Sequence, residues 1–181
     1  MAPASSQGFR ISFGYHQVED RLLVIFGEQS GEAKTVALTR RLTGRIVNAL
    51  AQVLKKSNNE ARNAPSELQD DIILLEHQYA LQDRQSSTSS QASGERQQNK
   101  SKTVVGDGSV QLVHAAQIVS KPDGFVFVFL GPQHPLVTMN LSRKDLHRLL
   151  ETLSLYAHKV DWDIPVDMTW LNPDLSKIII N

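Results

Sequence analysis

The sequence predicts an α+β protein made of two copies of a β-β-β-α unit, each with an antiparallel sheet, with helices packed on the sheets about a pseudo-twofold axis. Residues 11–56 align with 114–159 at a constant offset of 103 without a gap, and eight of the 46 aligned pairs are identical. The apolar strands, turn signals and helix starts of the two copies also coincide. Because an offset can be chosen to favour identities, a chance match of two amphipathic units stays open as the alternative.

Each copy reads as strand, turn, strand, loop, strand and helix. In the second copy Lys121-Pro-Asp-Gly124 is a strong tight-turn signal, since proline presets φ and glycine accepts a positive φ. The first copy has a weaker turn at 18–21. The central strands 22–26 and 125–130 are apolar at successive positions, so we expect both of their faces to be covered.

One helix follows the third strand in each copy. Thr39 and Ser142 are the expected N-cap residues, because their hydroxyls can accept from free backbone N–H groups. Behind them, apolar residues recur at helical spacing and should lie on the sheet. They are Leu42, Ile46, Leu50, Val53 and Leu54 in the first copy, and Leu146, Leu149, Leu150, Leu153 and Ala157 in the second.

A third helix is predicted over 66–81, between the copies. Ser66 and Gln69 have the spacing of a capping box. Its apolar stripe consists of Leu68, Ile72, Leu75 and Tyr79, with Ile73 and Leu74 beside it. This surface is wider than a solvated linker helix needs, so we expect the helix to bridge the two copies.

The chain therefore divides into five segments: a first unit at 1–58, the bridging helix at 59–81, a flexible linker at 82–109, a second unit at 110–160 and a C-terminal arm at 161–181. The linker is rich in Ser, Gln and Gly and almost free of large apolar residues. Such a segment cannot bury enough surface to offset the entropy of ordering its backbone.

The C-terminal arm has no counterpart after the first helix. Its anchoring candidates are Trp162, Trp170 and Leu171. In one interpretation the arm lies over the sheet and closes the core, since tryptophan is usually partly buried. In the other, the three residues dock on a second subunit or another protein.

Charge is balanced overall but not locally. The chain has 19 Lys plus Arg and 19 Asp plus Glu, and residues 1–58, 59–81, 82–109 and 110–181 carry +4, −4, +1 and −1. Basic residues cluster at both helix starts, where they oppose the helix dipole: Arg40, Arg41 and Arg45 in the first copy, and Arg143, Lys144 and Arg148 in the second. They either pair with nearby carboxylates or contact a phosphate, a nucleic acid or an acidic protein.

Local motifs for catalysis, metal binding or cofactor binding are missing from the sequence. The absence of cysteine excludes disulfides, thiolate zinc sites and a cysteine nucleophile. No two of the six histidines are three or four positions apart, and neither a Gly-x-Ser-x-Gly elbow nor a glycine-rich phosphate loop occurs. We expect no catalytic residue, metal or cofactor. Without a bilayer-spanning apolar stretch or a signal pattern, a cytoplasmic location is expected.

These observations favour a non-enzymatic interaction or regulatory protein that acts through protein–protein contacts. The alternative is a module for single-stranded DNA or RNA, with the paired arginine clusters as the anion site and Phe13 and Tyr15 as stacking platforms. An enzyme ranks third, because catalytic residues can converge from distant loops. A homodimer through an exposed sheet edge or the apolar face of 66–81 is a further expectation.

Overall fold

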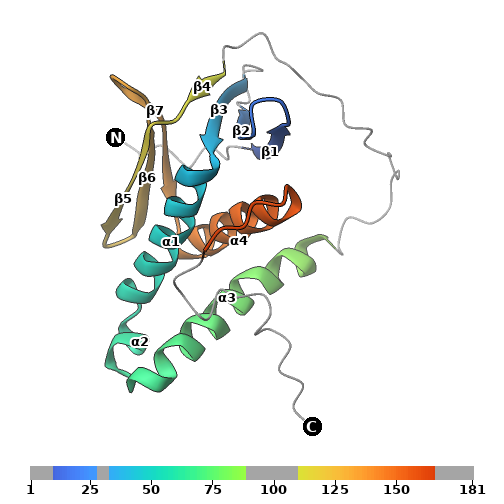
Figure 1. Cartoon of the computed structure of the whole chain (residues 1–181). Coiled ribbons are helices and arrows are strands. Elements are labelled where there is room, and N and C mark those ends of the chain that lie inside the picture. Colours follow the sequence, from blue (N-terminus) through green and yellow to red (C-terminus); the bar gives the residue numbers. More distant parts are fainter. Residues whose placement is uncertain (1–9, 28–32, 89–109, 166–181) are drawn as a thin grey trace.

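The computed structural model describes residues 10–27, 33–88 and 110–165, which form two sheets and their helices (Figure 1). The first copy contains β1 (Arg10–His16), β2 (Arg21–Gly27), β3 (Ala33–Thr39) and α1 (Arg40–Ser57). The second contains β5 (Ala115–Lys121), β6 (Gly124–Leu130), β7 (Pro135–Leu141) and α4 (Arg143–Lys159). Between them lie α2 (Asn59–Asn63), α3 (Ser66–Thr88) and β4 (Gln111–Leu112). The α+β class is confirmed, and none of the described helices combines the length and the hydropathy needed to cross a bilayer.

The two copies share one topology. Each is an antiparallel meander, in the order β1-β2-β3 or β5-β6-β7, followed by its helix. The central strands β2 and β6 show the same alternation of burial, with Leu22, Val24 and Phe26 buried in one and Phe125, Phe127 and Phe129 in the other. The duplicated β-β-β-α unit is thus present in the structure.

The expectation that both faces of the central strands are covered is wrong in part. The alternate residues of β2 and β6, such as Ile25 and Val128, are only partly buried among the described residues. Branched apolar residues fit the pleated backbone of a strand in their own right, so their presence does not require full burial.

The gapless alignment also needs one correction, at the first strand of each copy. The β1–β2 turn has four residues and the β5–β6 turn has two. As a result Tyr15 pairs with Leu22 whereas Ser120 pairs with the equivalent Phe125, an offset of 105 rather than 103. A shift of two residues keeps every side chain on its original face, so the sequence pattern conceals it.

The two sheets are joined where the chain passes from β4 to β5. The Val113 N–H donates to the Ala37 carbonyl of β3 at 2.9 Å, and the His114 N–H donates to the Leu130 carbonyl of β6 at 2.8 Å. The equivalent residues Phe26 and Phe129 meet with their ring centroids 6.2 Å apart. Contact between equivalent residues is typical of a twofold arrangement.

The predicted caps of the two repeated helices are confirmed. The Thr39 hydroxyl accepts from the Leu42 N–H at 3.1 Å, and Ser142 forms a complete capping box with Asp145. The capping box predicted for Ser66 and Gln69 at the start of α3 is wrong. Ser66 already lies inside the helix, and the Gln69 side chain donates to the Ala64 carbonyl. The helix also continues to Thr88, through the first residues of the predicted linker, and 89–109 lie outside the described residues.

Candidate functional site

The arginines at the two helix starts donate to backbone carbonyls of the opposite copy. Arg143 Nη2 donates to the Leu54 carbonyl at 2.7 Å, in the last turn of α1. Arg40 Nη2 donates to the Asp163 carbonyl at 3.1 Å, in the extended segment that follows the end of α4. The carbonyl end of a helix is the negative end of its dipole. A charge that is unfavourable at its own helix start is therefore favourable at the end of the neighbouring antiparallel helix.

Arg143 has a second set of contacts, with α3. Its Nε and Nη2 both bind the Glu76 carboxylate of α3, Nη2 at 2.9 Å, while Nη1 donates to the Ser57 hydroxyl at the end of α1. Asn58 donates to the same carboxylate at 2.9 Å. Burial acts to raise the pKa of Glu76, but His147, Arg143 and Asn58 outweigh it and hold that pKa well below its usual range. These contacts correspond to the interpretation of Arg143 as one half of a structural ion pair.

The six basic residues at the two helix starts do not form one continuous basic surface. Arg41 and Arg45 are exposed at the start of α1, as is Arg40 apart from its carbonyl contact. Arg148 lies 3.7 Å from Asp145 of its own helix, and Lys144 is partly buried. Because α1 and α4 are antiparallel, the two basic groups lie at opposite ends of the helix pair.

The strand aromatics face other parts of this chain. The Phe13 ring lies 5.2 Å from the Tyr156 ring of α4. Tyr15 packs edge-on against Trp162 at 6.0 Å, and its hydroxyl donates to Asp20 at 2.6 Å. Both rings are therefore engaged with other parts of this chain, and both side chains are partly buried.

Trp162 fixes the start of the C-terminal arm to the first copy. It is 5 % exposed, and its indole N–H donates to Asp20 Oδ1 at 2.6 Å. Hydrogen bonds from Tyr15 and Trp162 lower the pKa of Asp20. Trp162 thus lies where the core-closing interpretation puts it, whereas Trp170 and Leu171 lie outside the described residues.

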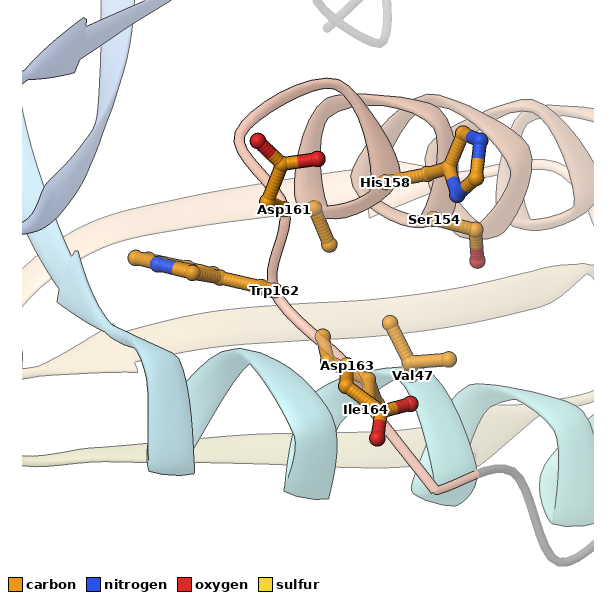
Figure 2. A pocket seen from close by; sticks show the side chains of 8 residues that line it. Val47, Ser154, His158, Asp161, Trp162, Asp163 and Ile164 are labelled. Carbon is orange, nitrogen blue, oxygen red and sulfur yellow. The ribbon is translucent and has the colours of Figure 1, made fainter.

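A hollow of about 350 Å³ lies beside the arm, between α1 and α4 (Figure 2). Its lining consists of Val47, Ser154, Ala157, His158, Asp161, Trp162, Asp163 and Ile164. Ser154 Oγ is buried there without a hydrogen-bond partner among the described residues. Figure 2 shows the carboxylates of Asp161 and Asp163 pointing away from one another, so they do not converge on one ligand atom. Nowhere in the described ranges do three His, Asp or Glu residues gather to hold a metal ion.

The helix α3 has two different faces. Ile73, His77 and Ala80 are buried, and the helix contacts α1, α2 and α4. A second row of apolar residues points outward: Leu68, Leu75 and Tyr79 are 50 %, 65 % and 68 % exposed. We call these three residues the outer stripe. In Figure 1, α3 lies on the far side of α4 from the two sheets.

Sequence reasoning missed a buried polar cluster beneath α3. His77 and His147 approach each other to 3.1 Å although they are 70 positions apart in the chain. A search for metal-ligand spacing cannot find such a pair. One signal was available: His147 lies within the apolar row of α4, next to Leu146, and takes the position of Gly44 in the first copy.

A scan against protein-family models finds no family that matches this chain, and searches of curated proteins and of solved structures find no significant match.

Proposed function

We propose that the protein acts by binding another protein chain through the outer stripe of α3. The observation that carries this proposal is the exposure of Leu68, Leu75 and Tyr79, on a helix whose opposite face is already buried. An amphipathic helix of a monomeric protein normally keeps one apolar face, and that face lies against the core. Covering the part of such a side chain that is still exposed contributes about 1–2 kcal/mol, so a second apolar face favours association.

The charges beside the outer stripe indicate the chemistry of the partner. Asp70 and Glu76 are engaged by Lys55 and Arg143. Glu67 and Asp71 are exposed, and their spacing of four places them on the same edge of α3. An apolar row with an acidic edge fits a basic amphipathic helix, whose apolar face would cover Leu75 and whose Lys or Arg side chains would face Asp71.

Nucleic-acid binding is the second candidate, and the exposure of Arg41 and Arg45 favours it. Fewer residues support this function than support protein binding. Arg143 is engaged by Glu76, and the Phe13 and Tyr15 rings contact Tyr156 and Trp162 of the same chain. The double variant R41Q/R45Q tests it in a titration with single-stranded DNA at two salt concentrations. Salt-dependent binding that this variant loses would support the nucleic-acid function; absence of binding by the wild type would exclude it for this surface.

Site-specific crosslinking tests the protein-binding proposal. A photo-reactive amino acid replaces Leu75 in one full-length protein and Val18, an exposed apolar residue of the β1–β2 turn, in a second. In an extract of the source cells, position 75 should yield a discrete crosslinked chain and position 18 much less of it. In a separate pull-down with tagged protein that has no photo-reactive residue, Leu75→Glu should abolish capture of that chain without lowering the melting temperature, while Val18→Glu should leave capture unchanged.

The crosslinked product also identifies the kind of partner. A product of twice the chain mass, together with a dimer in light scattering, would show that the partner is a second copy of this chain. Equal yields from positions 75 and 18, or capture that survives Leu75→Glu, would refute the outer stripe as the binding surface.

A further inference from the structure

Two buried histidines connect α3 to α4. His77 of α3 and His147 of α4 are 6 % and 0 % exposed, and their Nδ1 atoms are 3.1 Å apart. Their other ring nitrogens face carboxylates, with His77 Nε2 3.2 Å from Glu151 Oε2 and His147 Nε2 3.4 Å from Glu76 Oε1. The result is a row of carboxylate, imidazole, imidazole and carboxylate that spans the contact between the two helices.

The contact between the two Nδ1 atoms accepts only certain protonation states. A neutral imidazole has one N–H and one lone pair, so one ring can donate through Nδ1 while the other accepts. The contact also survives when one ring is charged and the other neutral. When both rings are charged, an N–H group faces an N–H group and two positive charges are brought together. The hydrogen bond is then lost and replaced by repulsion.

The surrounding charges do not offset that repulsion. Glu76 from α3 and Glu151 from α4 are negative, but Glu76 is already bound by Arg143, which adds a positive charge next to His147. The end of α1 contributes neutral groups, the Ser57 hydroxyl and the Asn58 amide. Burial, together with the charges of His77 and Arg143, lowers the pKa of His147 despite the opposing effect of Glu76.

We propose that the contact between His77 and His147 is an acid-sensitive latch, which holds α3 on α4 while at most one ring is charged and releases α3 when both become charged. The direction follows from the protonation of His147. Its pKa is lower in the folded protein than the ordinary value of 6.5, so its contribution to stability is complete above that value and is lost as the pH falls below it. Because the pKa of Glu76 lies far lower, that carboxylate keeps its charge in the same range. The inference concerns the attachment of α3 and does not depend on the proposed partner.

Hydrogen exchange of the full-length protein at pH 7.5 and pH 5.0, corrected for the intrinsic pH dependence of exchange, tests the latch. Protection of peptides from α3 should fall at pH 5.0, by at most about tenfold per pH unit for one linked proton, while peptides from β2 and β6 keep their protection. His147→Gln, which cannot become charged, should remove this pH dependence. His158→Gln, at an exposed position near the end of the same helix, should retain it.

Unchanged protection of α3 between the two pH values would overturn the proposal. So would an equal loss in α3 and the sheets, or a pH dependence that persists in His147→Gln. His77→Gln removes the second ring but leaves His147 buried beside Arg143, so it should reduce the pH dependence without abolishing it. A pH dependence that is unchanged in His77→Gln would also overturn the proposal, which therefore stays testable if His147→Gln does not fold.

Discussion

The N-terminal halves of α1 and α4 have equivalent faces in the two copies, but these faces contact two different segments of the chain. The equivalent positions are Arg40, Gly44 and Asn48 on α1, and Arg143, His147 and Glu151 on α4. On α1 this face contacts the extended residues 163–165, and on α4 it contacts the helix α3. One duplicated surface has thus been adapted to two kinds of backbone.

An extended segment packs on a helix when side chains of the helix donate hydrogen bonds to its backbone carbonyls and leave room for its backbone. Its carbonyls are not used within the segment, and Arg40 and Asn48 donate to those of Asp163 and Pro165 at 3.1 and 2.9 Å. Gly44 lets the arm approach closely, because a Cβ at this position would lie 3.2 Å from Cγ2 of Ile164. This copy of the face therefore provides a residue without a side chain, Gly44, and two side-chain donors, Arg40 and Asn48.

A helix requires side-chain partners instead. The carbonyls of α3 are satisfied within the helix, so it presents side chains such as Glu76 and His77. Arg143, His147 and Glu151 supply the matching charge and ring nitrogens. Of the three equivalent positions, the arginine alone is the same in both copies, and in each copy it donates to a backbone carbonyl, of Asp163 in one and of Leu54 in the other.

The largest difference between the copies is expected for the two arginines. Arg143→Gln leaves the partly buried Glu76 without its cation and should lower the free energy of unfolding by about 2–3 kcal/mol, less than for a fully buried pair. Arg40→Gln removes one exposed hydrogen bond and should cost under about 1 kcal/mol. Urea denaturation of both variants measures the difference, and equal losses would show that Glu76 adds nothing to the role of Arg143.

A second expectation concerns the glycine of the α1 face. Gly44→His copies the α4 residue onto α1 and collides with Ile164, so it should cost about 1–2 kcal/mol by overpacking. In a Trp170→Phe background, which leaves Trp162 as the single tryptophan of the chain, quenching of its fluorescence by iodide should increase as the arm is displaced. Gly44→Ser adds the same Cβ without the ring, so its loss of stability should be smaller than that of Gly44→His. Unchanged stability and quenching in Gly44→His would mean that the close approach of the arm is not needed.

The helix starts allow a finer comparison. Ser142→Ala removes a hydroxyl that caps α4 and belongs to a reciprocal pair with Asp145, and it should cost about 1–1.5 kcal/mol. Thr39→Ala removes a single cap from α1 and should cost about 0.5–1 kcal/mol. Thermal unfolding at neutral pH ranks the two variants, and the reverse order would contradict a contribution from Asp145.

The smallest effect is expected at the end of α4, where the chain turns back toward α1. Asp161 has a φ of 56°, and the Trp162 N–H bonds to the Ala157 carbonyl at 2.9 Å in a Schellman motif. Asp161→Gly should raise the free energy of unfolding by about 0.5 kcal/mol, since glycine accepts this φ and a negative charge leaves the helix end. Asp20→Gly, at a φ of 50°, should be destabilising instead because it loses the bonds from Tyr15 and Trp162. Denaturation curves of both variants test this opposition of sign.

The sequence by itself determined the features that depend on neighbouring residues. The turn at Gly124 is an example: its φ is 150°, and a Cβ there would lie 2.7 Å from the Leu141 carbonyl oxygen. The strands, the caps at Thr39 and Ser142 and the repeat were predictable for the same reason, since periodicity and turn chemistry act over a few residues. The two-residue shift at β5 escaped the prediction because it preserves the alternation of faces.

Only the tertiary structure decided which groups meet across long stretches of chain. The partner of Arg143 is 67 positions away, and His77 and His147 are separated by 70. The sequence also does not show which apolar row of α3 faces inward, because Ile73 and Leu75 are equally apolar. In the structure Ile73 is 0 % exposed and Leu75 is 65 % exposed. A helix can rotate about its axis without changing its local hydrogen bonds, so its inward face is chosen by the side chains that receive it, here Arg143, His147 and Glu151 of α4.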